Sequence, residues 1–164
     1  DYLFFTDADC RVPPRWIEAT LARYTPDTGM VAGGIITTMS PVVPQWISDC
    51  QSLEWLFFCT AAEACAILGR PQSVFGNNLS LRRSVSTRGK RKFWNMGSLT
   101  EDYMIFKSVQ EQNHKTPLYV TSDTLVRTAP LKDISQLIRQ KKDGLPEDES
   151  VRCSPFCSWG FPFS

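Results

Sequence analysis

The stretch Phe4-Phe5-Thr6-Asp7-Ala8-Asp9-Cys10 decides how the rest of the chain is interpreted. It continues an apolar run that begins at Tyr2 and predicts a strand, and it ends on two carboxylates two positions apart. Alternate side chains of an extended segment point to the same side, so Asp7 and Asp9 are expected to face one object. At the carboxyl end of a strand in an open α/β sheet, that object is usually a ligand.

The chemistry of this pair indicates what the ligand would be. Carboxylate oxygens are hard donors that suit Mg²⁺ or Mn²⁺, and these ions bind phosphate oxygens in turn. The pattern therefore predicts a site for a metal ion and a diphosphate at Asp7 and Asp9. The alternative is that Asp-Ala-Asp is the polar turn that ends a strand, because Asp is common in turns. This short motif alone does not decide between the two.

Composition narrows the class of protein. The chain has 164 residues, which suffices for one domain with a core, and its formal net charge of +1 predicts no nucleic-acid partner. Six cysteines without a CxxC pair, and a single histidine, make a zinc site unexpected and favour free thiols in a reducing compartment. The chain starts in mid-strand without a charged leader, which indicates a fragment rather than a signal peptide. The longest apolar run, Leu53 to Leu68, contains two Glu residues and falls short of the ~20 apolar residues of a membrane span.

Hydrophobic periodicity predicts an α/β protein in which strands and helices are mixed along the chain. The expected strands cover residues 2–5, 30–36, 79–81, 118–120 and 124–126, and the expected helices cover about 12–24, 45–68, 103–112 and 131–142. The first helix is expected to present Trp16, Ile17 and Leu21 at helical spacing. The long second helix is expected to bury an apolar face, and a position on a membrane surface is the less favoured alternative. That face comprises Trp46, Ile47, Cys50, Leu53, Phe57, Ala61, Ala64 and Leu68.

Two further motifs have both a structural and a functional interpretation. Gly76-Asn77-Asn78 suits a tight turn, and it also offers backbone and amide groups to sugar hydroxyls. In Thr100-Glu101-Asp102, Thr100 can cap a helix and the helix dipole favours the carboxylates that follow. An Asp at a helix start beside a cleft is equally well placed as a general base toward an acceptor hydroxyl.

The order and spacing of these motifs resemble the family-2 glycosyltransferases of the GT-A fold, including their membrane-associated, cellulose-synthase-like and N-acetylglucosaminyltransferase-like members. The resemblance runs from Asp1 to about Lys142. Asp7-Ala8-Asp9 is similar to the metal-binding DxD segment of that family. The stretch from Gly76 to Arg83 is similar to its G-x-N-x-x-x-R-R segment, which lines the donor and acceptor pocket. Thr100-Glu101-Asp102 is similar to its TED segment, whose Asp is the catalytic base.

The resemblance implies a partial GT-A catalytic domain at 1–142, with a Rossmann-like mixed sheet that lacks its N-terminal strands, and a divergent or disordered tail at 143–164. It implies an inverting, metal-dependent transfer of a hexosyl group, as in polysaccharide biosynthesis. The donor would be a nucleotide-diphosphate sugar and the acceptor a hydroxyl of a glycan or lipid, at the cytoplasmic face of the cell membrane. By this resemblance Asp102 is the base and Asp7 and Asp9 hold Mg²⁺ or Mn²⁺. The remaining expected donor-site residues are Gly76, Asn78, Glu101 and Gln140.

The C-terminal part departs from the family pattern. Gln140 could begin the QxxRW signature, but Asp143 and Gly144 stand where Arg and Trp belong. A second register, Gln136 to Arg139, leaves Gln140 in the Trp position. The uracil-contacting strands expected upstream of Asp1 are also missing, so the isolated fragment is expected to be inactive if those strands are indispensable.

Two alternatives remain open. A haloacid-dehalogenase-like phosphatase would use Asp7 as nucleophile and Asp9 as acid/base, although Arg11 stands where that class has Thr or Val. The other alternative is a catalytically incomplete remnant or a binding module, since the Arg-Trp pair and the upstream strands are absent from this sequence.

Overall fold

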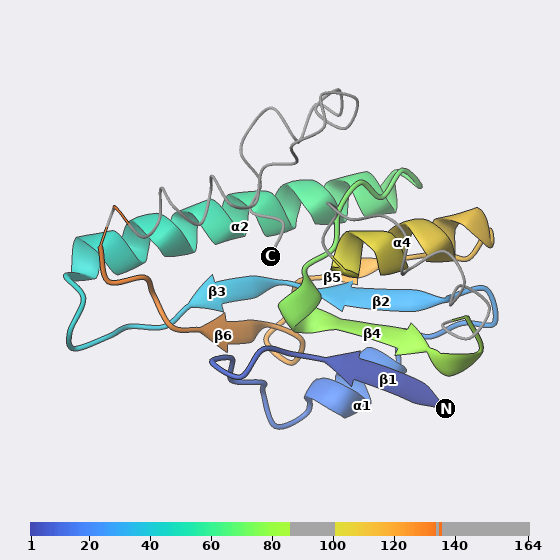
Figure 1. The fold of residues 1–164 in the computed structure, drawn as a ribbon, viewed down its shortest axis with the longest axis horizontal. Coiled ribbons are helices and arrows are strands. Elements are labelled where there is room, and N and C mark those ends of the chain that lie inside the picture. The colour runs from blue at the N-terminus through green and yellow to red at the C-terminus, as the bar shows by residue number, and fades with distance from the viewer. Residues whose placement is uncertain (86–100, 134, 136–164) are drawn as a thin grey trace.

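The computed structural model describes residues 1–85, 101–133 and 135. Its fold is mixed α/β, with a four-stranded mixed sheet and a two-stranded parallel sheet flanked by helices (Figure 1). The α/β class predicted from the sequence is confirmed at this level. The predicted tail at 143–164 and Gln140 lie outside the described residues. Of the helix predicted at 131–142, only residues 131–133 and 135 are described.

The described elements follow one another in the predicted order. The helical segments are α1 (Trp16–Leu21), α2 (Gln45–Ile67), the 3-10 turn η1 (Gly76–Asn78) and α4 (Glu101–Glu111). The strands are β1 (Tyr2–Phe5), β2 (Met30–Gly33), β3 (Ile35–Thr37), β4 (Leu79–Arg82), β5 (Leu118–Tyr119) and β6 (Val126–Thr128). The last strand was predicted at 124–126, whereas β6 begins at Val126 and ends at Thr128.

The larger sheet has the strand order β1-β4-β2-β5, and β4 is antiparallel to both of its neighbours. Phe5 pairs with Leu79 across β1 and β4, so the end of β1 lies beside the start of β4. Because η1 directly precedes β4, the loop that follows β1 meets η1 at this edge of the sheet. This pairing is what sets the position of the acidic motif.

The segment predicted as one strand at 30–36 forms two strands in different sheets. β2 pairs with β4 and β5, whereas β3 pairs with β6. The chain leaves the first sheet at Gly34, and the Ile35 N–H donates a hydrogen bond to the sulfur of Cys59 on α2 (3.3 Å). Burial raises the pKa of Cys59 to about 11, so it remains a thiol at neutral pH. The prediction of a single strand was wrong because glycine carries no signal for a change of sheet.

The core lies between the larger sheet and the helices α2 and α4, which Figure 1 shows above the strands. Its largest members come from β2, β4, α2, the segment before η1, and α4. They include Met30, Leu79, Leu81, Phe58, Phe75, Phe106 and Val109.

The bounds predicted for α2 are confirmed, but its predicted inner face was wrong. Trp46, Leu53 and Phe57 are exposed. The buried positions are Ser48, Gln51, Phe58, Cys59 and Ala62. Large apolar residues surround most of this helix, so their spacing does not select the side that packs inward. None of the described helices is long and apolar enough to cross a membrane.

The first helix is also shorter than predicted and oriented differently. It buries Trp16 and Thr20, whereas Ile17 is exposed. Trp16 packs edge-on against Phe4 of β1, with ring centroids 5.2 Å apart. This contact attaches α1 to the edge strand that leads into the acidic motif.

Candidate functional site

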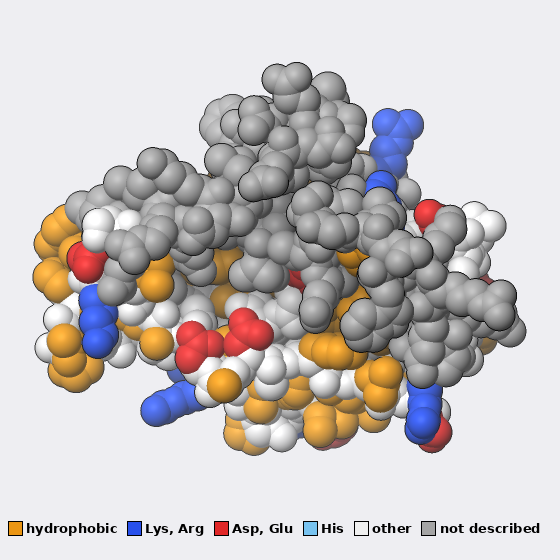
Figure 2. Space-filling view, in the orientation of Figure 1, with side chains coloured by type: hydrophobic (Ala, Val, Ile, Leu, Met, Phe, Trp, Pro, Cys, Tyr) orange, Lys and Arg blue, Asp and Glu red, His pale blue; other side chains and the backbone are white. Residues whose placement is uncertain are grey.

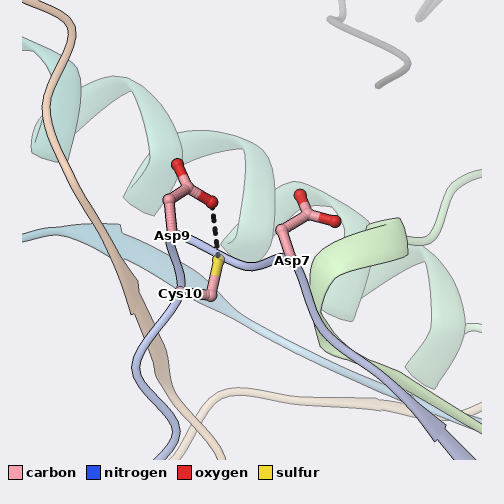
Figure 3. A group of neighbouring side chains, drawn as sticks. All are labelled: Asp7, Asp9 and Cys10. Atoms are coloured by element: carbon pink, nitrogen blue, oxygen red, sulfur yellow. Dashed lines mark hydrogen bonds between the residues drawn. The ribbon is translucent and has the colours of Figure 1, made fainter.

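The residues Asp7 to Cys10, here called the acidic turn, follow the end of β1. The strand ends at Phe5, and the N–H of Cys10 bonds to the carbonyl of Asp7 (3.1 Å), so Asp7 and Asp9 lie on a tight turn rather than on an extended strand. Carboxylate oxygens of both residues and the Cys10 sulfur lie within 4.8 Å of one another (Figure 3). The sequence predicted that the two carboxylates meet, but the turn, and not strand alternation, brings them together.

The second carboxylate is held by two neighbours. The Thr128 hydroxyl at the end of β6 donates to Asp9 Oδ2 (3.3 Å), and the Cys10 thiol donates to Asp9 Oδ1 (3.8 Å). Both Asp7 and Asp9 are exposed. Figure 2 shows acidic side chains gathered over the loop that follows β1. The sequence analysis did not predict that Cys10 contacts the Asp pair. Its position directly after Asp9 could have indicated this contact.

The pKa values of two side chains in the acidic turn are shifted from their usual values. Partial burial and then the charge of Asp9 raise the pKa of Asp7. Burial likewise raises the pKa of the Cys10 thiol, which keeps it protonated at neutral pH. Two exposed carboxylates at this separation offer the hard oxygen donors that Mg²⁺ and Mn²⁺ prefer, and a protonated thiol is a poor ligand. The donor set therefore fits the predicted ions through Asp7 and Asp9.

A pH-dependent stability difference follows from the raised pKa of Asp7. The folded state binds this proton more tightly than the unfolded state, so ionising Asp7 costs stability as pH rises through and above its usual value of 3.8. In a chelator-containing buffer, Asp7→Asn is expected to raise Tm slightly at pH 7 and to leave Tm unchanged near pH 3. The gain is small because Asp7 is mostly in contact with solvent. A lower Tm for the variant at pH 7 would contradict this account.

The turn η1 contacts Asp102, the residue of the Thr100-Glu101-Asp102 motif that was predicted to be the catalytic base. The Gly76 N–H donates to Asp102 Oδ2 (3.1 Å), and Asp102 is buried. A β-carbon at position 76 would lie 3.1–3.3 Å from side-chain atoms of Asp102, so any residue other than glycine would require Asp102 to shift by a few tenths of an ångström. Asp102 lies in the first turn of α4, where the helix dipole stabilises a carboxylate. The side chain of Glu101 and all of Thr100 lie outside the described part of the chain.

Asn78 connects three separate segments. Its amide nitrogen donates to the carbonyls of Gly34 (2.6 Å) and Thr124 (2.7 Å), and its amide oxygen accepts from Trp16 Nε1 (2.9 Å). The side chain is almost fully buried. The amide predicted to contact sugar hydroxyls is therefore engaged by protein groups, and what it contributes is the fixed position of η1.

The three motifs converge on η1. β1 and α4 both contact this turn, and Figure 3 shows Asp7 beside it. The end of β1, which leads into the acidic turn, and Asp102 at the start of α4 therefore both lie next to η1, although the motifs are far apart in the sequence. Of the residues predicted for the site, Asp7 and Asp9 lie together in the acidic turn and Gly76 contacts Asp102, while Gln140 lies outside the described residues.

The chain matches no protein-family model and no curated protein. The order of its motifs and their arrangement around η1 therefore carry the functional argument.

Proposed function

We propose that the chain is the catalytic part of an inverting, metal-dependent family-2 glycosyltransferase with a GT-A fold. It would transfer a sugar from a nucleotide-diphosphate donor to a hydroxyl of a glycan or lipid at the cytoplasmic face of the cell membrane. The observation that carries the proposal is the convergence on η1, where the Gly76 N–H bonds to Asp102 while the end of β1 delivers the acidic turn.

In this proposal Asp102 accepts the proton of the acceptor hydroxyl as that hydroxyl attacks the anomeric carbon. A positioned base of this kind contributes ~10²–10⁴-fold to rate. The bond from Gly76 fixes one carboxylate oxygen, Oδ2, and so fixes the orientation of the whole group. Inversion requires the base and the leaving diphosphate on opposite sides of the sugar, so in this proposal the sugar lies between Asp102 and the acidic turn.

The acidic turn would hold the diphosphate end of the donor. A Mg²⁺ or Mn²⁺ ion at Asp7 and Asp9 would supply positive charge against the leaving group. The chain's own contribution is to keep the carboxylates in place, and the bond from Thr128 to Asp9 does this from β6. Burial and the charge of Asp9 raise the pKa of Asp7, and a bound cation would favour ionisation of this carboxylate.

A binding experiment tests the proposal. Thermal unfolding of the chain is followed with UDP- and GDP-sugars, with and without Mn²⁺. A ligand at 100 times its Kd stabilises the folded state by about 2.7 kcal/mol, so Tm is expected to rise only when donor and Mn²⁺ are both present. Asp9→Asn is expected to abolish the rise.

The matched control is Asp27→Asn, because Asp27 is an exposed carboxylate that pairs with Lys115 (3.4 Å) away from the acidic turn. This variant should retain the full Mn²⁺-dependent shift. A chain whose Tm responds neither to Mn²⁺ nor to any nucleotide sugar with Mn²⁺ would contradict the proposed metal and diphosphate site. Hydrolysis of an aryl phosphate that is lost in Asp7→Asn would instead assign the acidic turn to a phosphatase.

A further inference from the structure

Among the described residues, one side of α2 has large apolar side chains that are exposed along the length of the helix. This group, here called the α2 stripe, consists of Trp46, Leu53, Leu56, Phe57, Ile67 and Leu68, whose exposed fractions range from 49% to 79%. In Figure 2, apolar side chains gather at the left-hand end of the molecule, over the beginning of α2. Soluble proteins seldom expose so large a contiguous apolar surface without a use for it.

The inward side of α2 is already fully used. It packs on β3 and β5 through small and polar residues as well as Phe58 and Cys59. Gln51 is bound there at both ends of its amide, since it donates to the Leu131 carbonyl (3.2 Å) and accepts from the Leu131 N–H (2.9 Å). Turning α2 to bury the stripe would break these bonds, so burial of the stripe needs a partner other than the described residues that already pack on α2.

The charges of α2 disfavour a lipid bilayer as that partner. The helix contains no Lys or Arg and carries Asp49, Glu54 and Glu63. Helices that lie on anionic membranes have Lys and Arg on their polar side, next to the apolar one. An acidic helix with an apolar stripe suits another protein surface better.

The dimensions of the stripe suit a second copy of the same helix. α2 has 23 residues and is therefore roughly 34 Å long. Complete burial of the six side chains of the stripe would approach, as an upper limit, the ~800 Å² that each partner buries in a standard interface. Trp46 lies near one end, Ile67 and Leu68 at the other, and Leu53, Leu56 and Phe57 between them. An antiparallel pair would place Trp46 against Ile67 and Leu68 and the central residues against themselves.

We propose that the α2 stripe is the interface between two copies of this chain, packed antiparallel about a two-fold axis near Leu56. A two-fold axis brings the same patch of both subunits into contact. The α2 stripe allows this because large apolar residues lie at both of its ends and at its centre. The inference concerns assembly and does not depend on the proposed sugar transfer.

Sedimentation equilibrium of the full chain tests it. The wild type is expected to dimerise, and Leu53→Glu/Phe57→Glu to weaken the dimer by at least tenfold, because it would bury four charges in the interface. The control is Ile17→Glu, which charges an exposed apolar residue on α1 and should leave the dimer constant unchanged. Because every substituted side chain is exposed, circular dichroism is expected to show the same fold for all variants. If the double variant fails to fold, the wild type's state still decides: a monomer at high micromolar concentration overturns the proposal.

Cross-linking tests the geometry independently. With Cys50 replaced by Ser, Leu56→Cys near the axis is expected to form a disulfide between subunits under mild oxidation, whereas Leu68→Cys at the helix end is not. Cross-linking of Leu68→Cys alone would overturn the antiparallel arrangement. A monomer that instead sediments with phosphatidylcholine vesicles through the α2 stripe would assign the surface to a membrane and also overturn the proposal.

Discussion

Replacing Asp102 by Asn is expected to reduce the proposed glycosyl transfer by about 10²–10⁴-fold in the active enzyme. The substitution removes the basic group but leaves an amide oxygen that can accept the hydrogen bond from the Gly76 N–H. Donor affinity should change little, because the acidic turn that would bind the diphosphate is untouched. The loss should therefore appear in kcat, measured by release of nucleoside diphosphate, with KM for the donor nearly constant.

Asp123→Asn is the control for this experiment. Asp123 is an exposed carboxylate that pairs with Arg15 at 3.7 Å, so its loss should leave kcat within about twofold, as expected for a surface pair. Wild-type turnover in Asp102→Asn would remove Asp102 from the mechanism. Loss of donor binding in this variant would mean that Asp102 acts on the donor and not on the acceptor.

Gly33→Ala is expected to destabilise the fold by about 3–5 kcal/mol. A β-carbon at this position would lie 2.4 Å from Asn78 Nδ2 and 2.7 Å from its Cγ, so the amide must move. Displacing it breaks the bonds to Trp16 and Thr124 and leaves buried polar groups without partners. Chemical unfolding monitored by tryptophan fluorescence measures the change directly.

The neighbouring glycine provides the comparison. A β-carbon at Gly34 would meet the methyl groups of Val120 at 3.0 and 3.1 Å, and these can give way more easily than a buried amide with three hydrogen bonds. Gly34→Ala should therefore cost clearly less than Gly33→Ala. Equal costs would show that crowding, and not the Asn78 hydrogen bonds, dominates at this junction.

Local chemistry made several elements predictable. The apolar run before the Asp pair correctly gave β1, and proline and glycine positions correctly bounded α2. The junction at Gly34 was not predictable, because the choice of sheet depends on pairing with β6, more than eighty residues further along the chain. The inward side of α2 was also missed, since it includes the polar residues Ser48 and Gln51, and Gln51 bonds to Leu131, far along the chain.

The candidate site shows the same division. The sequence placed Asp7 and Asp9 together and put Asp102 at a helix start, because both features depend on neighbouring residues. It could not reveal that Gly76 bonds to Asp102, since that contact depends on how α4 packs against η1. The role of Asn78 was likewise hidden, because its partners come from three distant segments.

The three hydrogen bonds of Asn78 hold η1 in place, and η1 lies next to both Asp102 and the end of β1 that leads into the acidic turn. The positions of these acidic residues therefore depend on the segments around Trp16, Gly34 and Thr124, which supply the partners of Asn78. Heating or mutation that loosens the turn before β6, or that removes the indole of Trp16, would free η1 and so alter the surroundings of Asp102 and of the acidic turn in a single event. Hydrogen exchange should accordingly find the backbone amides of η1, of the Gly34 junction and of the first turn of α4 opening together, with one shared free energy.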